Sequence, residues 1–219
     1  MTPITKLCGM MQERDVIAAR DVSADYIGFV LAKSRRQVTP DQVVTWRQAV
    51  PDAPKPVLVL VDEDEETIVS LCQQTGVNHV QLCGEETPAL CNSLRVRHQL
   101  TVWKAWGVYG DERDRAIMTY AESVDAILLD KKAPGQAGGT GKPFSWDAIG
   151  SIKAYCPTLP LIVAGGLTPE NVATLLQDIE VDGVDVSSGI ETNGQKDRVK
   201  IERFVDEVRR ATHDQSSTG

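Results

Sequence analysis

Short apolar runs alternate along the chain with longer segments in which apolar and polar positions are interleaved. Each run is rich in valine, isoleucine or leucine and is bounded by polar residues or glycine, which is typical of buried β-strands. The pattern predicts strands at Ile4–Cys8, Tyr26–Leu31, Val57–Val61, His79–Leu82, Val102–Ala105, Ala126–Leu129, Leu161–Val163 and Gly183–Val186.

The segments between these runs carry the marks of amphipathic helices. Thr39–Gln42 supplies an N-cap threonine, a proline at the first helical position and a glutamine that completes a capping box. Thr168–Asn171 opens a second helix in the same way. A final helix is predicted by apolar residues spaced i, i+3, i+4 and i+7, namely Ile201, Phe204, Val205 and Val208.

Alternating strands and helices indicate right-handed βαβ units and therefore a parallel sheet. The repeat fills the chain in units of similar length, which favours a closed (β/α)8 TIM barrel over an open doubly wound sheet. We expect one barrel domain over residues 1–212 and a frayed polar tail over residues 213–219. In such a barrel the active site lies at the carboxyl ends of the strands.

Composition narrows the choice of partners. The formal net charge of -8 argues against a nucleic-acid partner, because binding along a phosphate backbone needs a basic surface. No apolar stretch is long enough to span a membrane, and the start of the chain lacks a secretion signal. The five cysteines form no CxxC pair, which favours a reducing compartment, so we expect a cytoplasmic protein. The barrel uses most of the apolar positions, so we expect a monomer.

Two turns that follow the last two predicted strands are suited to phosphate binding. Gly165 and Gly166 allow the backbone to approach a ligand closely, and Ser187-Ser188-Gly189 forms a small turn. The N–H groups of these turns, and of the helix expected at Thr168, can point at a phosphate. The alternative is that both are simply tight turns. Because phosphate sites of this fold follow these two strands, we expect a small phosphorylated substrate.

Two groups capable of proton transfer end predicted strands. Cys8 can act as a base only as a thiolate, which needs positive potential nearby, and its alternative role is that of a small core residue. Asp130 follows an apolar run, where desolvation suits a carboxyl to general-acid chemistry, and its alternative role is to cap a loop backbone. Lys6 lies on the same side of its strand as Cys8, so a place inside the barrel would require a counter-charge, for which we predict Asp185.

Two other patterns suggest a metal site and a nucleotide-binding loop at first sight, but neither meets the requirements of such a site. His79 and Cys83 have no third residue at ligand spacing, so we expect no metal site. The glycine-rich segment 134–142 departs from a nucleotide-binding P-loop at two required positions. We therefore interpret its glycines, Gly138, Gly139 and Gly141, as hinges of a lid that excludes water from the site.

The chain resembles the phosphoribosylanthranilate isomerases at motifs that cover nearly its whole length. These are Lys6-Leu7-Cys8-Gly9, Gly28-Phe29-Val30, Ser34-Arg35-Arg36, Val80-Gln81-Leu82, Leu128-Leu129-Asp130, Gly138-Gly139-Thr140-Gly141-Lys142, Ala164-Gly165-Gly166-Leu167 with Pro169-Glu170-Asn171, and Val184-Asp185-Val186-Ser187-Ser188-Gly189. No single motif is decisive, but together and in this order they are highly specific.

The resemblance implies an Amadori rearrangement in tryptophan biosynthesis. The aminoaldose N-(5'-phosphoribosyl)anthranilate becomes the aminoketose 1-(2-carboxyphenylamino)-1-deoxyribulose 5-phosphate. By the same resemblance, Asp130 is the general acid that protonates the furanose oxygen, and Cys8 is the general base that takes the proton from C2. No cofactor is implied, since the protonated imine is itself the electron sink.

The resemblance also implies the binding residues. Arg36 matches an arginine near the anthranilate carboxylate, which a guanidinium binds in bidentate fashion, and neighbouring Arg35 is the alternative. Asp185 matches an aspartate that lines the site. The backbones of Gly166 and Ser187-Ser188 match those that hold the phosphate.

The sequence departs from the family's pattern at two places. Cys83 stands where the family usually has a histidine after strand four, so we expect a weaker or different substrate contact there. Leu31–Lys33 replaces a stretch that is often aromatic and contains proline. One alternative is a related aminoaldose isomerase of histidine synthesis, but strand one would then end in aspartate rather than Cys8. The other is an inactive phosphate-binding barrel, which Cys83 favours and the retained Cys8 and Asp130 disfavour.

Overall fold

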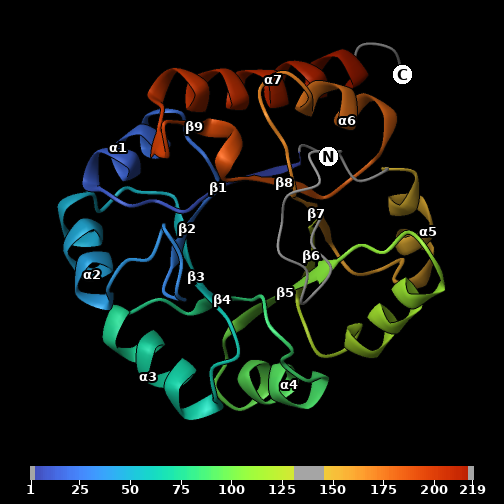
Figure 1. The fold of residues 1–219 in the computed structure, drawn as a ribbon, viewed down its shortest axis with the longest axis horizontal. Coiled ribbons are helices and arrows are strands. Elements are labelled where there is room, and N and C mark those ends of the chain that lie inside the picture. Colours follow the sequence, from blue (N-terminus) through green and yellow to red (C-terminus); the bar gives the residue numbers. More distant parts are fainter. Residues whose placement is uncertain (1–2, 131–145, 217–219) are drawn as a thin grey trace.

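The computed structural model describes residues 3–130 and 146–216; residues 1–2, 131–145 and 217–219 lie outside the described part. Eight parallel strands form a closed barrel in chain order, and the helices surround it as an outer ring (Figure 1). The ring closes between the first and last strands, where Lys6 is in register with Asp185. The predicted (β/α)8 barrel is therefore confirmed.

The strands lie close to their predicted positions. Four have the predicted bounds, and the other four differ by one or two residues at one or both ends. They are β1 (Ile4–Cys8), β2 (Tyr26–Val30), β3 (Lys55–Leu60), β4 (His79–Leu82), β5 (Thr101–Gly107), β6 (Ala126–Asp130), β7 (Leu161–Val163) and β8 (Gly183–Val186).

The outer elements follow the strands in turn. They are α1 (Glu13–Asp21), α2 (Pro40–Ala49), α3 (Glu65–Thr75), α4 (Pro88–Val96), η1 (Glu112–Tyr120), α5 (Asp147–Tyr155), α6 (Val172–Asp178) and α7 (Arg198–Ser216), with the 3-10 turn η2 (Ser188–Ile190) and the hairpin of β9 (Glu191–Thr192) and β10 (Gln195–Lys196) between β8 and α7. No helix of the described residues is long and apolar enough to cross a membrane.

Of the two helix starts predicted from the sequence, that of α2 is confirmed and that of α6 is wrong. α2 has the predicted capping box, with Thr39 accepting from the Gln42 N–H. The helix predicted from Thr168 begins only at Val172, because Asn171 Oδ1 accepts from the Thr168 N–H at 2.8 Å and stabilises a separate turn. α7 runs to Ser216, four residues beyond the expected end of the barrel domain.

The side chains of the strands face two different environments. Outward-facing residues such as Leu7, Ile27 and Val80 are fully buried against the helices. Inward-facing residues form a separate apolar cluster of Val57, Trp103, Ala126, Leu128, Ile162 and Ala164. Lys6, Gln81 and Asp185 alternate with outward-facing neighbours and so share this interior. The interior thus combines an apolar base with charged and polar groups.

Aspartates before three strands fasten the amino-terminal end of the barrel. Asp25, Asp125 and Asp182 each precede a strand and accept a backbone N–H from the strand before it. The donors are Thr5, Val102 and Leu161, at 2.7–2.8 Å. The same three aspartates return their own N–H to the carbonyls of these residues. This repeated bond links β1 to β2, β5 to β6, and β7 to β8. All three links lie at the amino-terminal end of the barrel, away from the carboxyl-terminal end where we expect the active site.

Candidate active site

A buried ion pair lies inside the barrel below its carboxyl-terminal mouth. Lys6 Nζ on β1 donates to Asp185 Oδ1 on β8 at 2.7 Å, and the Lys6 side chain is 0% exposed. The predicted pair is therefore confirmed. Burial acts to lower the pKa of Lys6, but the charge and hydrogen bond of Asp185, together with the Cys8 thiol, outweigh it and raise that pKa. Lys6 is consequently a permanent cation at the floor of the mouth.

Cys8 ends β1 directly above this cation. Its side chain is buried, and burial raises the pKa of the thiol; the Lys6 and Lys196 cations act to lower that pKa, and the Asp185 charge acts to raise it. Gly28, beside it on β2, leaves the space that the thiol occupies. A Cβ at Gly28 would lie 2.7 Å from Cys8 Sγ and 3.3 Å from Lys6 Nζ. Cys8 therefore has the positive surroundings that a thiolate needs, within a packed setting.

Arg36 and Ser187 meet Gly9, the residue after Cys8. A Cβ at Gly9 would lie 2.5 Å from Arg36 Cδ and 3.2 Å from Ser187 Oγ. The loops after β1, β2 and β8 thus converge at one corner of the mouth. The side chain of Arg36 is 20% exposed, and that of Arg35 is 53% exposed. Of the two arginines that the sequence left open, Arg36 is the more buried one and the one that contacts Gly9.

Glu191 on β9 holds this corner together, and sequence reasoning missed it. Its carboxylate accepts from Arg36 Nε at 2.6 Å, from Arg35 Nη2 at 2.5 Å and from Lys196 Nζ at 3.0 Å. Burial acts to raise the pKa of Glu191, but the cations of Arg36 and Lys196 outweigh it and hold the pKa at about 2. Its position two residues after the Ser187-Ser188-Gly189 turn was the only available signal.

Lys196 on β10 was also missed. Its Nζ donates to the Ser187 carbonyl at 2.9 Å, and its side chain is 1% exposed. Burial lowers the pKa of this amine even though Glu191 acts in the opposite direction. The β9–β10 hairpin therefore places a second lysine beneath the turn after β8. Its counter-charge, Glu191, is shared with Arg35 and Arg36, so this corner keeps an excess of positive charge although the chain as a whole is negative.

The two predicted phosphate turns lie against each other. Gly165 and Gly166 after β7 have φ of 78° and 90°, a region that favours glycine. Gly189 of η2 packs so closely on the β7 loop that a Cβ there would lie 1.9 Å from the Leu167 carbonyl oxygen. The structure thus joins Gly165, Gly166 and the Ser187–Gly189 turn into one surface. The helix expected to contribute at Thr168 starts four residues later.

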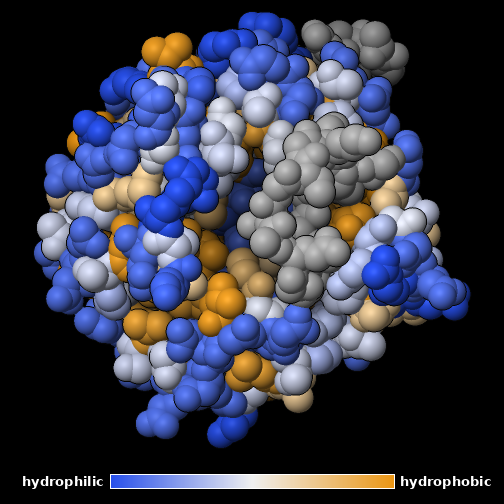
Figure 2. Space-filling view, in the orientation of Figure 1, coloured by the Kyte–Doolittle hydropathy of each residue, from blue (hydrophilic) through white to orange (hydrophobic). Residues whose placement is uncertain are grey.

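Asp130 is the last residue of β6 and is partly exposed. Its register with Gly107 on β5 puts it at the mouth, where β6 and β1 are separated by β7 and β8. Cys8 and Asp130 therefore stand on different sides of the same opening, which Figure 2 shows as a hollow with hydrophilic residues at its floor. The lid glycines Gly138, Gly139 and Gly141 lie outside the described residues.

Cys83 follows β4 and behaves as a neutral thiol. Burial raises its pKa to about 12, and Gln81 Nε2 donates to its sulfur at 3.2 Å. Lys104 on β5 holds the loop that carries Cys83. Its Nζ donates to the Gly84 carbonyl at 2.8 Å and forms an ion pair with Glu86 at 3.2 Å. Among the described residues, no group of three or more His, Cys, Asp and Glu is placed to hold a metal ion.

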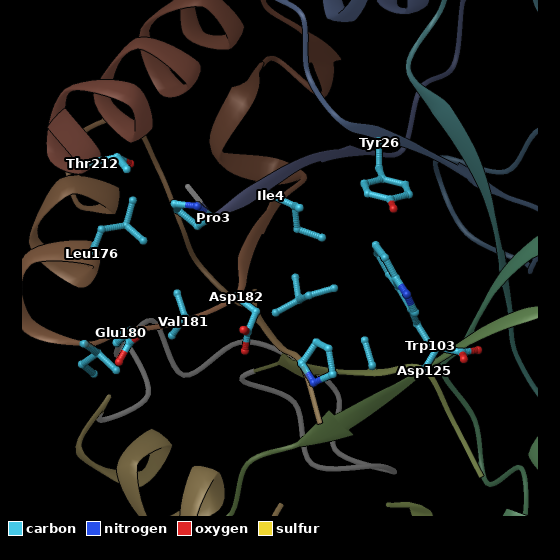
Figure 3. Close-up of a pocket in the computed structure, with 14 residues that line it drawn as sticks. Pro3, Ile4, Tyr26, Trp103, Asp125, Leu176, Glu180, Val181, Asp182 and Thr212 are labelled. Carbon is cyan, nitrogen blue, oxygen red and sulfur yellow. The ribbon is translucent and has the colours of Figure 1, made fainter. Parts of the chain in front are cut away.

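A separate cavity of about 470 Å³ opens at the amino-terminal end of the barrel. Tyr26 and Trp103 border it on one side and Leu176 and Thr212 on the other (Figure 3). Its charged lining residues are the acids Asp125, Glu180 and Asp182. None of the predicted site residues is among its described lining residues, and its acidic lining disfavours a phosphorylated ligand.

Comparison with known proteins identifies relatives of this arrangement. The family model described as N-(5'phosphoribosyl)anthranilate (PRA) isomerase matches residues 5–207. A curated relative, the N-(5'-phosphoribosyl)anthranilate isomerase of Brevibacillus brevis, is 39% identical over 213 residues, covering 97% of this chain and 95% of its own.

Solved structures agree with the sequence relatives. The dimeric phosphoribosylanthranilate isomerase of Thermotoga maritima, crystallised as monomers, superposes with a TM-score of 0.80 at 32% identity and covers 94% of this chain and 98% of its own. A phosphoribosyl anthranilate isomerase in complex with reduced 1-(o-carboxyphenylamino)-1-deoxyribulose 5-phosphate superposes with a TM-score of 0.81 at 31% identity, over the same shares of both chains.

Proposed function

The chain belongs to the N-(5'-phosphoribosyl)anthranilate isomerase family and is an isomerase of tryptophan biosynthesis, and from that premise we propose how its own residues carry out the rearrangement. The substrate is N-(5'-phosphoribosyl)anthranilate and the product is 1-(2-carboxyphenylamino)-1-deoxyribulose 5-phosphate. The observation that supports the proposal best is a thiol whose charge two buried lysines, Lys6 and Lys196, stabilise, with a carboxyl on another strand of the same mouth.

Asp130 acts first, as the general acid. It gives its proton to the furanose ring oxygen while the C1–O bond breaks, and the nitrogen lone pair forms the C1–N double bond of a protonated imine. Cys8, as thiolate, then removes the proton from C2, and the C2–H electrons move toward the iminium to give an enolamine. Return of a proton to C1 and loss of one from the C2 hydroxyl complete the ketone.

The surroundings of Cys8 explain why this position suits a base. Burial makes the thiolate costly, but Lys6 and Lys196 lie close enough to lower that cost. Lys6 itself stays charged because Asp185 lies 2.7 Å away. Cys83 does not compete as a second base, because burial raises its pKa to about 12.

The substrate's two anionic ends bind at opposite sides of the reacting carbons. The phosphate lies against the backbone N–H groups of Gly166 and Ser187-Ser188, with Lys196 below the turn. The anthranilate carboxylate binds the guanidinium of Arg36. Gly165, Cys83 and Asp185 line the space between. Fixing both ends orients C1 and C2 toward Asp130 and Cys8.

The fluorescence of N-(5'-phosphoribosyl)anthranilate provides the test. Purified protein should remove it, and Cys8→Ala and Asp130→Asn should each lower kcat/KM by about 10²–10⁴-fold, the usual contribution of one acid or base. The surface variant Glu202→Gln on α7 is the matched control and should keep the wild-type rate. Retention of most activity in either site variant would refute the role assigned to that residue.

We also propose a cytoplasmic monomer whose barrel domain ends near residue 212. The large apolar side chains that the described residues expose, Val61, Val96, Met118 and Val199, come from different elements. The five cysteines are free thiols, which suits a reducing compartment. Light scattering after gel filtration should give the mass of one chain, about 24 kDa. A mass twice as large would support a dimer, as in the Thermotoga maritima relative.

A further inference from the structure

The contact between Glu191 and Arg36 uses one particular edge of the guanidinium. Arg36 Nε donates to Glu191 Oε1 at 2.6 Å, and Nη2 donates to Oε2 at 3.2 Å. This is a side-on pair, with both carboxylate oxygens engaged. Such a contact fixes the plane of the guanidinium as well as its position, because rotation of the group would break one of the two bonds.

The end of the guanidinium stays available. A guanidinium has five N–H donors, and the side-on pair leaves one N–H of Nη1 and one of Nη2 on its end-on edge. In the described part of the chain, Nη1 of Arg36 has no hydrogen-bond partner. Arg36 Cδ and Nε pack over Gly9, the neighbour of Cys8, so the guanidinium lies beside the mouth of the barrel. A second carboxylate can bind this end in bidentate fashion.

The negative charge of Glu191 is offset by cations other than Arg36. Lys196 Nζ lies 3.0 Å from Oε1 of Glu191, and the Lys196 and Glu191 side chains are only 1% and 4% exposed. Arg35 adds a second positive charge at 2.5 Å. The carboxylate with its three cations keeps a net charge of about +2, so the corner still attracts an anion although a glutamate lies in it.

We propose that Glu191 is a positioning residue for the reaction: it holds Arg36 side-on so that the end of the guanidinium meets the substrate carboxylate. The inference rests on the proposed role of Arg36 in binding that carboxylate. It assigns Glu191 an effect on substrate binding and not on the proton transfers, which Cys8 and Asp130 perform.

Glu191→Gln separates positioning from simple electrostatics. The amide keeps the shape but can accept from only one guanidinium nitrogen, so Arg36 loses its fixed plane. Removing a negative charge beside an anion site would by itself tighten substrate binding. Positioning predicts the opposite: KM should rise about tenfold, with kcat within about twofold of wild type, as expected when a charge-assisted hydrogen bond is lost. An unchanged or lower KM would overturn the proposal.

A double-mutant cycle shows whether Glu191 acts through Arg36. Arg36→Ala should raise KM strongly, and adding Glu191→Gln to it should change KM by less than about twofold. A full tenfold rise in the Arg36→Ala background would mean that Glu191 acts independently, and the inference would fail. If Arg36→Ala leaves KM at the wild-type value, the proposed carboxylate site is wrong, which is a different result.

Two further variants distinguish the positioning role of Glu191 from a general loss of folding. Glu191→Asp keeps the counter-charge for Lys196 but is too short to reach both guanidinium nitrogens, so it should fold and still raise KM. Wild-type KM in this variant counts against the proposal, including when Glu191→Gln does not fold. Glu202→Gln, which breaks an exposed pair with Arg198, should leave KM unchanged. Melting temperatures of all variants identify any loss of fold.

Discussion

The two ends of the barrel are built from the same strands but contain different chemistry. At the amino-terminal end, the rings of Tyr26, His79 and Trp103 pack edge to face with centroids 4.4–5.2 Å apart. At the carboxyl-terminal end, the interior holds the Lys6–Asp185 pair and the Cys8 thiol. The first end is stabilised by packing and the second is organised by charge.

Polar groups serve different purposes at the two ends. The aspartates that precede β2, β6 and β8 bind backbone N–H groups and so fasten neighbouring strands. Lys6, Lys196 and Arg36 at the other end are each held by a carboxylate and together leave a positive mouth. Both ends open into solvent, but only the positive one suits a substrate with a carboxylate and a phosphate. Stability and function are therefore divided along the barrel axis.

Gly28→Ala should have the largest effect among the changes that test this division. The new methyl would lie 2.7 Å from Cys8 Sγ, so the thiol must move. A displacement of about 1 Å at a catalytic group costs up to about 10²-fold, and we expect kcat to fall by about 10- to 100-fold. Steady-state kinetics on a variant whose circular dichroism matches wild type provides the measurement. Wild-type kcat would contradict the packing described around Cys8.

The pH dependence of kcat/KM should report Cys8. Burial raises its pKa above the ordinary value of 9.0, and the base works only when deprotonated. Because the proposed acid Asp130 must be protonated while Cys8 is deprotonated, kcat/KM should follow a bell-shaped curve, and one limb of that curve should report the pKa of Cys8. Lys196→Met removes a cation that lowers this pKa, so the limb that reports Cys8 should move to higher pH. A limb that stays in place in the variant would show that Lys196 does not act on Cys8.

Cys83→Ala tests the departure from the family at the end of β4. The thiol is neutral and accepts one hydrogen bond from Gln81. Losing a neutral hydrogen bond of about 1 kcal/mol should lower kcat/KM by no more than about fivefold. A loss approaching that of Cys8→Ala would show that Cys83 takes part in the chemistry.

Asp125→Ala should change stability and leave the rate alone. It removes the acceptor of the Val102 N–H, bonded at 2.8 Å, and the partner of Arg95 at 3.0 Å. The free energy of unfolding should fall by about 1–2 kcal/mol in urea, while kcat and KM stay at wild-type values. A kinetic defect in a fully folded Asp125→Ala protein would contradict the separation of the two ends.

The sequence predicted the fold well because each strand carries its own local signal. Cys8, Arg36 and the phosphate turns could also be chosen from the sequence, because they follow the carboxyl ends of predicted strands, where the active site of this fold lies. The start of α6 was predicted wrongly because Asn171 bonds back to Thr168 and forms a turn that mimics a helix cap. Glu191 and Lys196 were missed for another reason. Glu191 meets Arg36 across 155 positions of sequence, and that contact exists only once the barrel has closed.

The most direct test of the central claim, that Cys8 removes the C2 proton, is the kinetic isotope effect with substrate deuterated at C2. Cys8→Ser should slow proton removal until it limits the rate, so the isotope effect on kcat should be larger than in the wild type. Asp130→Asn slows ring opening instead and should show an effect no larger than wild type. The reverse pattern, with the larger effect in Asp130→Asn, would contradict the assignment of base and acid.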